Sequence, residues 1–159
     1  MTYEHEDKKL NGFFRLTDDF ASIYGLSELS PNLIHIIWNR NTEPIDIELD
    51  GISIQLLSQQ LTTITNLQRV NFSETKLPIT AYSFNKEFYC IQTNDSEVSC
   101  NGIIFFGTQD LPIITLDDYE IEMFELLYRI FIEEFGNKDN VQDEMLRMLL
   151  KRLIIKTTR

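Results

Sequence analysis

The chain has 159 residues and a formal net charge of −11, and hydrophobic residues make up 43% of it. This composition is typical of one folded domain and excludes intrinsic disorder. A surface this acidic repels the phosphate backbone of nucleic acids, so the chain is not expected to bind DNA by itself. No apolar run approaches the length of a transmembrane helix and no signal-peptide core is found, which predicts a cytoplasmic protein without a membrane partner.

Strand-forming residues dominate much of the chain. It contains 20 Ile and 13 Thr but only two Ala, and β-branched side chains fit a pleated sheet better than a helix. Residues 1–30 are more mixed, with polar stretches around Phe13 and Phe14. We assign them to an N-terminal arm, with a short helix over residues 20–24 after the capping residues 17–19.

Short strands separated by turn residues are predicted for most of residues 31–116. The clearest turn is Asp50-Gly51, a two-residue hairpin signal flanked by alternating apolar residues. Spacing of this kind indicates a β-barrel or a β-sandwich. The predicted strands are 32–39, 45–49, 52–54, 61–65, 67–72, 77–84, 88–92, 97–100, 103–106 and 113–115.

After Leu116 the apolar residues change to helical spacing. A first helix is predicted over 118–135, with Gly136 at its C-terminal cap. A second helix is predicted over about 140–156, and residues 117–159 form a helical region. The expected fold class is therefore mainly β with C-terminal helices (α+β), a β-barrel followed by a helical hairpin.

The charge is unevenly distributed along the chain. Residues 1–139 contain 23 acids and 9 bases, whereas residues 140–159 contain 2 acids and 5 bases. The second helix also reaches the last residue without a Gly or Pro stop signal. We therefore expect this helix to continue into a further segment of the protein.

Residues that could carry chemistry are few. The chain has no Gly-rich phosphate loop and no nucleophile elbow, and its two histidines, His5 and His35, are too few for a metal site. No cofactor is expected, and His35 is predicted to be a partly buried strand residue hydrogen-bonded to a neighbour. Cys90 and Cys100 flank a turn, where they form either a redox pair or, as a reducing compartment favours, two small core residues.

Several segments match one family of regulators. They resemble the N-terminal half of AraC-type transcription regulators, in a subgroup typical of Bacteroidetes, over nearly the whole chain. The matching segments are 31–34 (PNLI), 37–39 (IWN), 84–91 (FNKEFYCI), 97–102 (EVSCNG), 105–107 (FFG) and 144–159 (EMLRMLLKRLIIKTTR).

This resemblance implies a cupin-like sensor barrel over residues 31–116, followed by dimerising helices and a DNA-binding domain with two helix-turn-helix units beyond Arg159. DNA would then be bound only through that further domain. Trp38, Tyr82, Phe84 and His35 are the expected lining of a pocket for a small-molecule effector. The His-x-His motif of metal-binding cupins does not occur in the chain, so no metal is carried over from the family.

A homodimer is expected through the apolar face of the second helix. The predicted interface residues are Met145, Leu146, Leu149, Leu150 and Leu153. The alternative is that this face packs inside the chain as core. Two other functions stay open beside a non-enzymatic regulator: a small cupin-type enzyme such as an isomerase, and a stand-alone interaction module.

Overall fold

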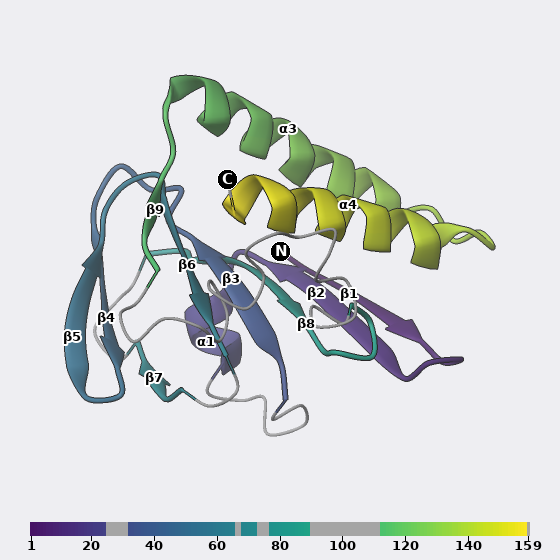
Figure 1. Cartoon of the computed structure of the whole chain (residues 1–159), viewed down its shortest axis with the longest axis horizontal. Coiled ribbons are helices and arrows are strands. Elements are labelled where there is room, and N and C mark those ends of the chain that lie inside the picture. The colour runs from purple at the N-terminus through teal and green to yellow at the C-terminus, as the bar shows by residue number, and fades with distance from the viewer. Residues whose placement is uncertain (25–31, 66–67, 73–76, 90–111, 159) are drawn as a thin grey trace.

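The computed structural model describes residues 1–24, 32–65, 68–72, 77–89 and 112–158. Within them the protein is mainly antiparallel β with helices at the C-terminal end, which confirms the predicted α+β class (Figure 1). The larger sheet has six strands in the order β1-β2-β8-β3-β6-β9, and the smaller has three in the order β5-β4-β7.

The strands and helices have the following bounds. The larger sheet contains β1 (Thr2–Asp7), β2 (Gly12–Thr17), β3 (Ile34–Trp38), β6 (Gln60–Ile64), β8 (Thr80–Phe84) and β9 (Ile114–Thr115). The smaller sheet contains β4 (Ile45–Leu49), β5 (Ile52–Leu56) and β7 (Val70–Asn71). The helices are α1 (Phe20–Tyr24), α3 (Asp118–Phe135) and α4 (Gln142–Thr158).

The two sheets do not close into the expected barrel. No strand ladder among the described residues connects the smaller sheet to the larger one. Asn39 forms the corner between them, because its buried side-chain amide donates to the carbonyl oxygens of Glu43 and Leu56, both at 2.9 Å. The fold is therefore a pair of facing sheets joined at a corner.

The described part of the predicted N-terminal arm belongs to the larger sheet. β1 pairs with β2 from Thr2↔Thr17 to Asp7↔Gly12, and β2 pairs with β8. The strand β1 went unpredicted because its sequence, TYEHED, is polar and it lies at the sheet edge. The short helix α1 follows β2 at the predicted position.

Most other elements lie where the sequence placed them. Asp50 and Gly51 both have positive φ angles, 50° and 82°, as a type I′ hairpin between β4 and β5 requires. The strand predicted over 67–72 is reduced to the two residues of β7. Phe88 and Tyr89 are described but lie outside any strand. The rest of 88–92, the strands predicted over 97–100 and 103–106, and both cysteines lie outside the described residues.

The helix α3 begins and ends as predicted. Asp117 accepts a hydrogen bond from the backbone N–H of Glu120, whose side chain accepts one from the N–H of Asp117, so a capping box starts the helix. Gly136 caps the C-terminus in a right-handed conformation; its N–H donates to the carbonyl oxygen of Glu133 at 3.1 Å, and the N–H of Asn137 donates to that of Glu134 at 3.0 Å.

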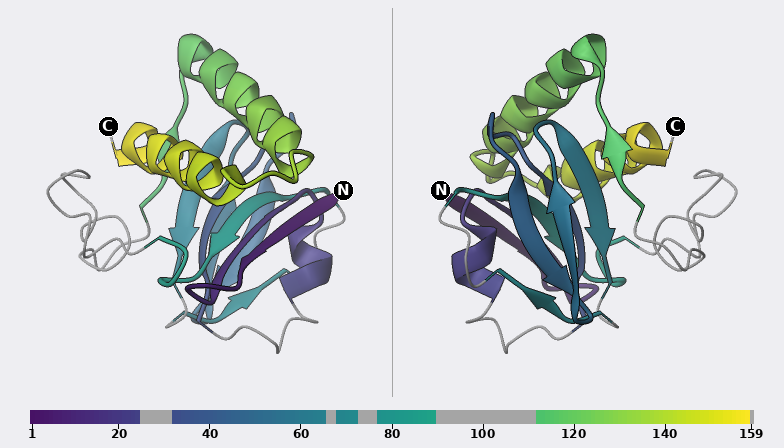
Figure 2. Two further views of the ribbon diagram at one scale, coloured as in Figure 1. Left: turned by 90° about the vertical axis from the view of Figure 1, so that its right-hand side faces the viewer. Right: turned by 90° about the vertical axis from the view of Figure 1, so that its left-hand side faces the viewer.

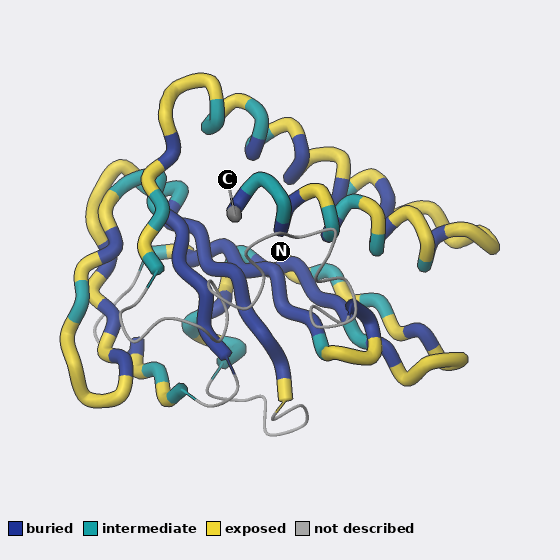
Figure 3. The backbone as a smooth tube through the Cα atoms, in the orientation of Figure 1, coloured by how far each residue is buried: buried dark blue, intermediate teal, exposed yellow. Residues whose placement is uncertain are grey.

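Both faces of the larger sheet are covered. Figures 1 and 2 show α3 and α4 together along one face, with α1 and the smaller sheet on the other side. Every residue of β3 and β8 is buried, and Figure 3 shows the central strands dark blue along their length. Two apolar cores result, one between the sheet and the helices and one between the sheets.

The apolar face of α4 packs within the chain. Leu146, Leu150 and Leu153 are fully buried in the core between the helices and the sheet, and Leu149 packs against that core from its edge. Of the five residues predicted to form a dimer interface, Met145 alone is exposed, at 38%. The prediction was wrong for the three buried leucines, because a helical stripe cannot distinguish an internal contact from an external one.

We expect Leu150→Ala to lower the free energy of unfolding by about 2–5 kcal/mol, because it leaves a cavity in a filled core. Urea denaturation measures this loss. Leu10, in the turn between β1 and β2, is 57% exposed, so Leu10→Ala should change stability by less than about 0.5 kcal/mol. Equal losses for the two variants would contradict the packing described here.

Candidate functional site

The four residues predicted to line an effector pocket lie on opposite faces of the sheet. Trp38, Tyr82 and Phe84 face the helices and are fully buried. The Trp38 ring meets Phe124 of α3 edge-on, with 5.9 Å between centroids, and the Tyr82 ring lies 5.0 Å from that of Phe131. These aromatic residues therefore fill the helix-side core. His35 alone faces the interior between the two sheets, beside Phe20.

The sheet face that carries His35 also carries four other buried polar residues, Arg15, Thr17, Thr62 and Ser83. We call this face, which is turned toward the smaller sheet, the inner face. Two adjacent cross-strand rows run over β2, β8, β3 and β6. The first row is Arg15, Ser83, His35 and Ile64, and the second is Thr17, Ala81, Ile37 and Thr62.

His35 is held in place by neighbours on several elements. Its Nδ1 lies 2.7 Å from the Ser83 hydroxyl, which confirms the predicted hydrogen bond to a neighbour. The Phe20 ring lies 4.8 Å away and the Tyr24 ring 5.7 Å away, centroid to centroid. Burial, assisted by the positive charge of Arg15, lowers the pKa of His35 to about 3. The imidazole is therefore neutral at physiological pH.

Arg15 is the least expected residue of the inner face. Its side chain is 3% exposed, yet no acceptor lies within hydrogen-bond distance of its Nε or Nη2 in the described protein. Burial lowers the pKa of its guanidinium, while the charge of Glu4, opposite on β1, raises it. The two side chains form no ion pair within 4 Å. The Arg15 guanidinium carbon lies 5.9 Å from the centroid of the Phe13 ring, but the cation is buried without a carboxylate partner.

A second unpartnered group lies two strands beyond Ser83. The Thr62 hydroxyl of β6 is fully buried and has no hydrogen-bond partner among the described residues. The apolar core on this side of the larger sheet includes Phe20, Ile64 and Phe72. The inner face therefore combines one cation, one neutral imidazole and the three hydroxyls of Thr17, Thr62 and Ser83 with apolar side chains.

Sequence reasoning overlooked Arg15. It directly follows Phe13 and Phe14, in the stretch that the sequence predicts to be an N-terminal arm and not a strand. A strand over residues 13–16 would have placed Phe14 and Leu16 on one face and Arg15 on the other. A cation opposite an apolar stripe normally faces water, so only the structure reveals that it is buried.

A second polar cluster connects the helices to the sheet. Arg40 binds Glu125 of α3 through two hydrogen bonds of 2.8 and 3.0 Å, and its guanidinium lies 3.9 Å from the ring centroid of Tyr128. The Tyr128 hydroxyl donates to Asp18 at 2.7 Å. Because these charged groups are paired with one another, the cluster holds α3 in position and leaves no group free for a ligand.

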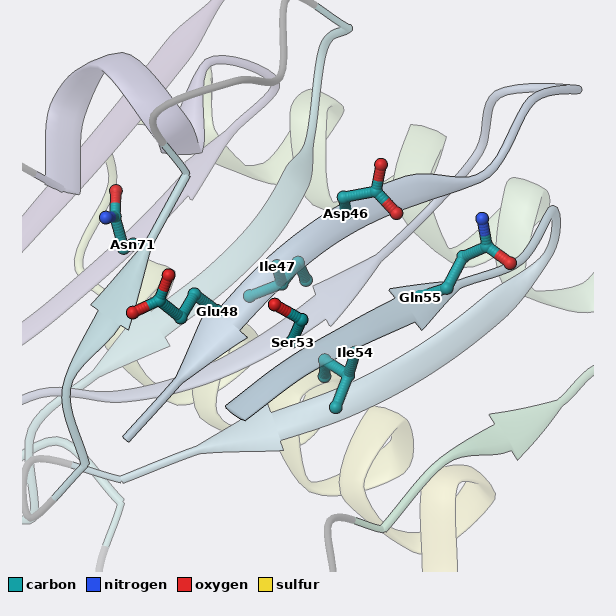
Figure 4. A pocket seen from close by; sticks show the side chains of 7 residues that line it. All are labelled: Asp46, Ile47, Glu48, Ser53, Ile54, Gln55 and Asn71. Atoms are coloured by element: carbon teal, nitrogen blue, oxygen red, sulfur yellow. The ribbon is translucent and has the colours of Figure 1, made fainter. Parts of the chain in front are cut away.

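A groove on the outer surface of the smaller sheet is open to solvent. Figure 4 shows its lining, to which β4 contributes Asp46 and Glu48 and β5 contributes Ser53 and Gln55. All four side chains are exposed. Two solvated carboxylates with no buried polar group beside them do not form a preorganised site.

The described residues contain no cluster of three His, Cys, Asp or Glu that could hold a metal ion. His5 pairs instead with Asp143 of α4. None of the described helices is both long and apolar enough to cross a membrane. Neither protein-family models nor curated proteins give a match to the chain.

Acid should destabilise the fold partly through His35. Because the folded-state pKa of about 3 lies below the unfolded value near 6.5, only the unfolded chain takes up this proton between those values. The contribution is complete above about pH 6.5 and is lost as the pH falls toward 3. From pH 7 to pH 5 we expect roughly 2 kcal/mol of this loss in urea denaturation.

The matched variant is His35→Gln, which keeps a polar side chain that does not titrate. Its stability should fall less than that of the wild type over the same pH interval. The carboxylates that also titrate are shared by both proteins, so the difference isolates His35. The same pH dependence in both proteins would show that His35 is not buried as a neutral ring.

Proposed function

We propose that the chain is the effector-sensing and dimerising half of an AraC-type transcription regulator, whose DNA-binding domain lies beyond Arg159. The observation that supports sensing is the arrangement of the two faces of the larger sheet. Each polar residue of the inner-face row lies between two residues that face the helices. Arg15 lies between Phe14 and Leu16, His35 between Ile34 and Ile36, and Ser83 between Tyr82 and Phe84.

This arrangement allows an effector to influence the helices through the strands alone. An effector bound at the inner face would contact residues whose direct neighbours pack against α3 and α4. A strand cannot shift one face without the other, since successive side chains share one backbone. The effector would then bias an equilibrium between two helix positions.

The N-terminal strand β1 is attached to helix α4. Arg147 of α4 pairs with the buried Asp7 of β1 and donates to the carbonyl oxygen of Phe88 at 2.9 Å. His5 of β1 pairs with Asp143 of α4. A change in β1 or β2 would therefore reach α4 directly as well as through the core.

Dimerisation has to use the exposed residues of α4. Val141, Met145 and Met148 are 54%, 38% and 64% exposed. The sequence of α3 contains six acids and one base, whereas α4 contains two acids and four bases. Opposite charge on neighbouring helices favours contact between α4 of one copy and α3 of another.

The enzyme alternative lacks comparable support in the described residues. Isomerisation needs an acid and a base positioned at one substrate atom. On the inner face, His35 is hydrogen-bonded to Ser83 and no carboxylate lies within its row. We therefore favour a binding function for this face.

The gene itself tests the regulator proposal. We expect the coding sequence after codon 159 to encode a basic segment with two helix-turn-helix units, and the complete protein to retard its own promoter DNA in gel-shift assays. Residues 1–159 alone should not retard the same DNA, because the surface is acidic. A stop codon directly after Arg159 would contradict the proposal.

We expect residues 1–159 to form a dimer in light scattering at micromolar concentrations. Met148→Glu should weaken that dimer at least tenfold without lowering the melting temperature of the subunit, because it places a charge in an apolar contact. Ile52→Glu is the control, since Ile52 is equally exposed, at 67%, but lies on the distant β5. A monomeric wild type, or equal weakening by both variants, would contradict the proposed interface.

A further inference from the structure

Arg15 distinguishes the inner face from an ordinary core. Apart from Arg15, the inner face combines neutral polar side chains with apolar ones, and the cation has two N–H-bearing nitrogens without an acceptor among the described residues. A buried guanidinium is normally paired with a carboxylate or several carbonyl oxygens. Natural proteins retain such unfavourable groups mostly where a function requires them.

We infer that Arg15 is the anchor of a binding site for a small organic monocarboxylate with an apolar body. This inference deepens the proposed function, on which it rests, by naming the ligand class of the same sensor. The planar guanidinium offers two parallel N–H bonds to a carboxylate. One negative charge on the ligand would balance the single positive charge of Arg15.

The neighbours of Arg15 determine the rest of the ligand. His35 and Ser83 lie in the same cross-strand row, and they add no charge because the imidazole is neutral. The apolar side chains of Phe20, Ile37 and Ile64 favour an aromatic or short aliphatic body. The unpartnered Thr62 hydroxyl can accept or donate one hydrogen bond at the far end of such a ligand.

A phosphate group fits this site less well than a carboxylate. Inorganic phosphate carries nearly two negative charges at neutral pH, and phosphate sites usually supply several donors from Lys, Arg or a helix N-terminus. The described part of the inner-face rows supplies Arg15 as its one cationic side chain. A second charge would therefore stay uncompensated in an apolar interior.

The test uses residues 1–159 with benzoate and hexanoate as probes and with benzamide and hexanamide as uncharged controls of the same shape. We expect at least one carboxylate to raise the melting temperature and to bind in isothermal titration calorimetry, and its amide to do neither. Arg15→Met should weaken carboxylate binding about 30-fold or more. Without ligand, this variant should melt at or above the wild-type temperature, because it removes an unpaired buried charge.

Arg15→Lys is the second variant, which keeps the charge and loses the planar pair of donors. It should bind the same carboxylate at least tenfold more weakly than the wild type. This variant therefore tests Arg15 as the carboxylate anchor even if Arg15→Met fails to fold. Equal binding of acid and amide, binding of inorganic phosphate in place of both acids, unchanged binding by the variants, or no binding at all would overturn the inference. A stop codon after Arg159 would overturn the regulator and leave this binding test valid.

Discussion

The structure depends on a sheet that is covered on both faces. β3 and β8 are buried along their whole length because α3 and α4 lie on one side and α1 with the smaller sheet lies on the other. No side chain of these strands can turn to water. The Tyr82 hydroxyl has no hydrogen-bond partner among the described residues, and the other polar side chains have to find one inside the protein. Ser83 and His35 do so by bonding to each other. The larger sheet is therefore the single layer of backbone between the two apolar cores.

Three arginines of this protein have buried or half-buried guanidinium groups, and they differ in the partners of those groups. Arg40 has a bidentate carboxylate partner in Glu125, and Arg147 has Asp7. Both connect a helix to the sheet, and both rest against an aromatic ring as well. Arg15 is the most buried of the three; it lies over the Phe13 ring but has no carboxylate partner within 4 Å among the described residues. A purely structural role accounts well for Arg40 and Arg147 but not for Arg15.

The sequence predicted the elements better than it predicted which side chains would meet. Turn chemistry at Asp50-Gly51 and the acidic start of α3 are local signals, so the hairpin and the helix were found near their true bounds. Which side chains of different strands meet depends on how the strands pair, and no local sequence signal gives that pairing. Alternation alone would have separated His35 from Trp38, because their positions on one strand differ by three and side chains an odd number of positions apart point to opposite faces. Trp38, Tyr82 and His35 were grouped by chemical type instead.

The burial of the apolar face of α4 could not be predicted from the sequence, for a related reason. Its leucines repeat at helical spacing, and this pattern specifies an apolar face but not the surface that covers it. In the folded chain the sheet covers Leu146, Leu150 and Leu153, and polar contacts from Asp7 and His5 hold the helix against β1.

The same helix is thus bound to the sheet by both apolar and charged contacts, next to strands whose other face carries Arg15. Close-packed layers do not deform continuously, so a small displacement of one strand is passed to the layer packed against it. Coupling between the inner face and the exposed side of α4 then requires no hinge and no lid. It requires that the sheet can adopt two positions, and that a ligand bound to Arg15 would stabilise one of them more than the other.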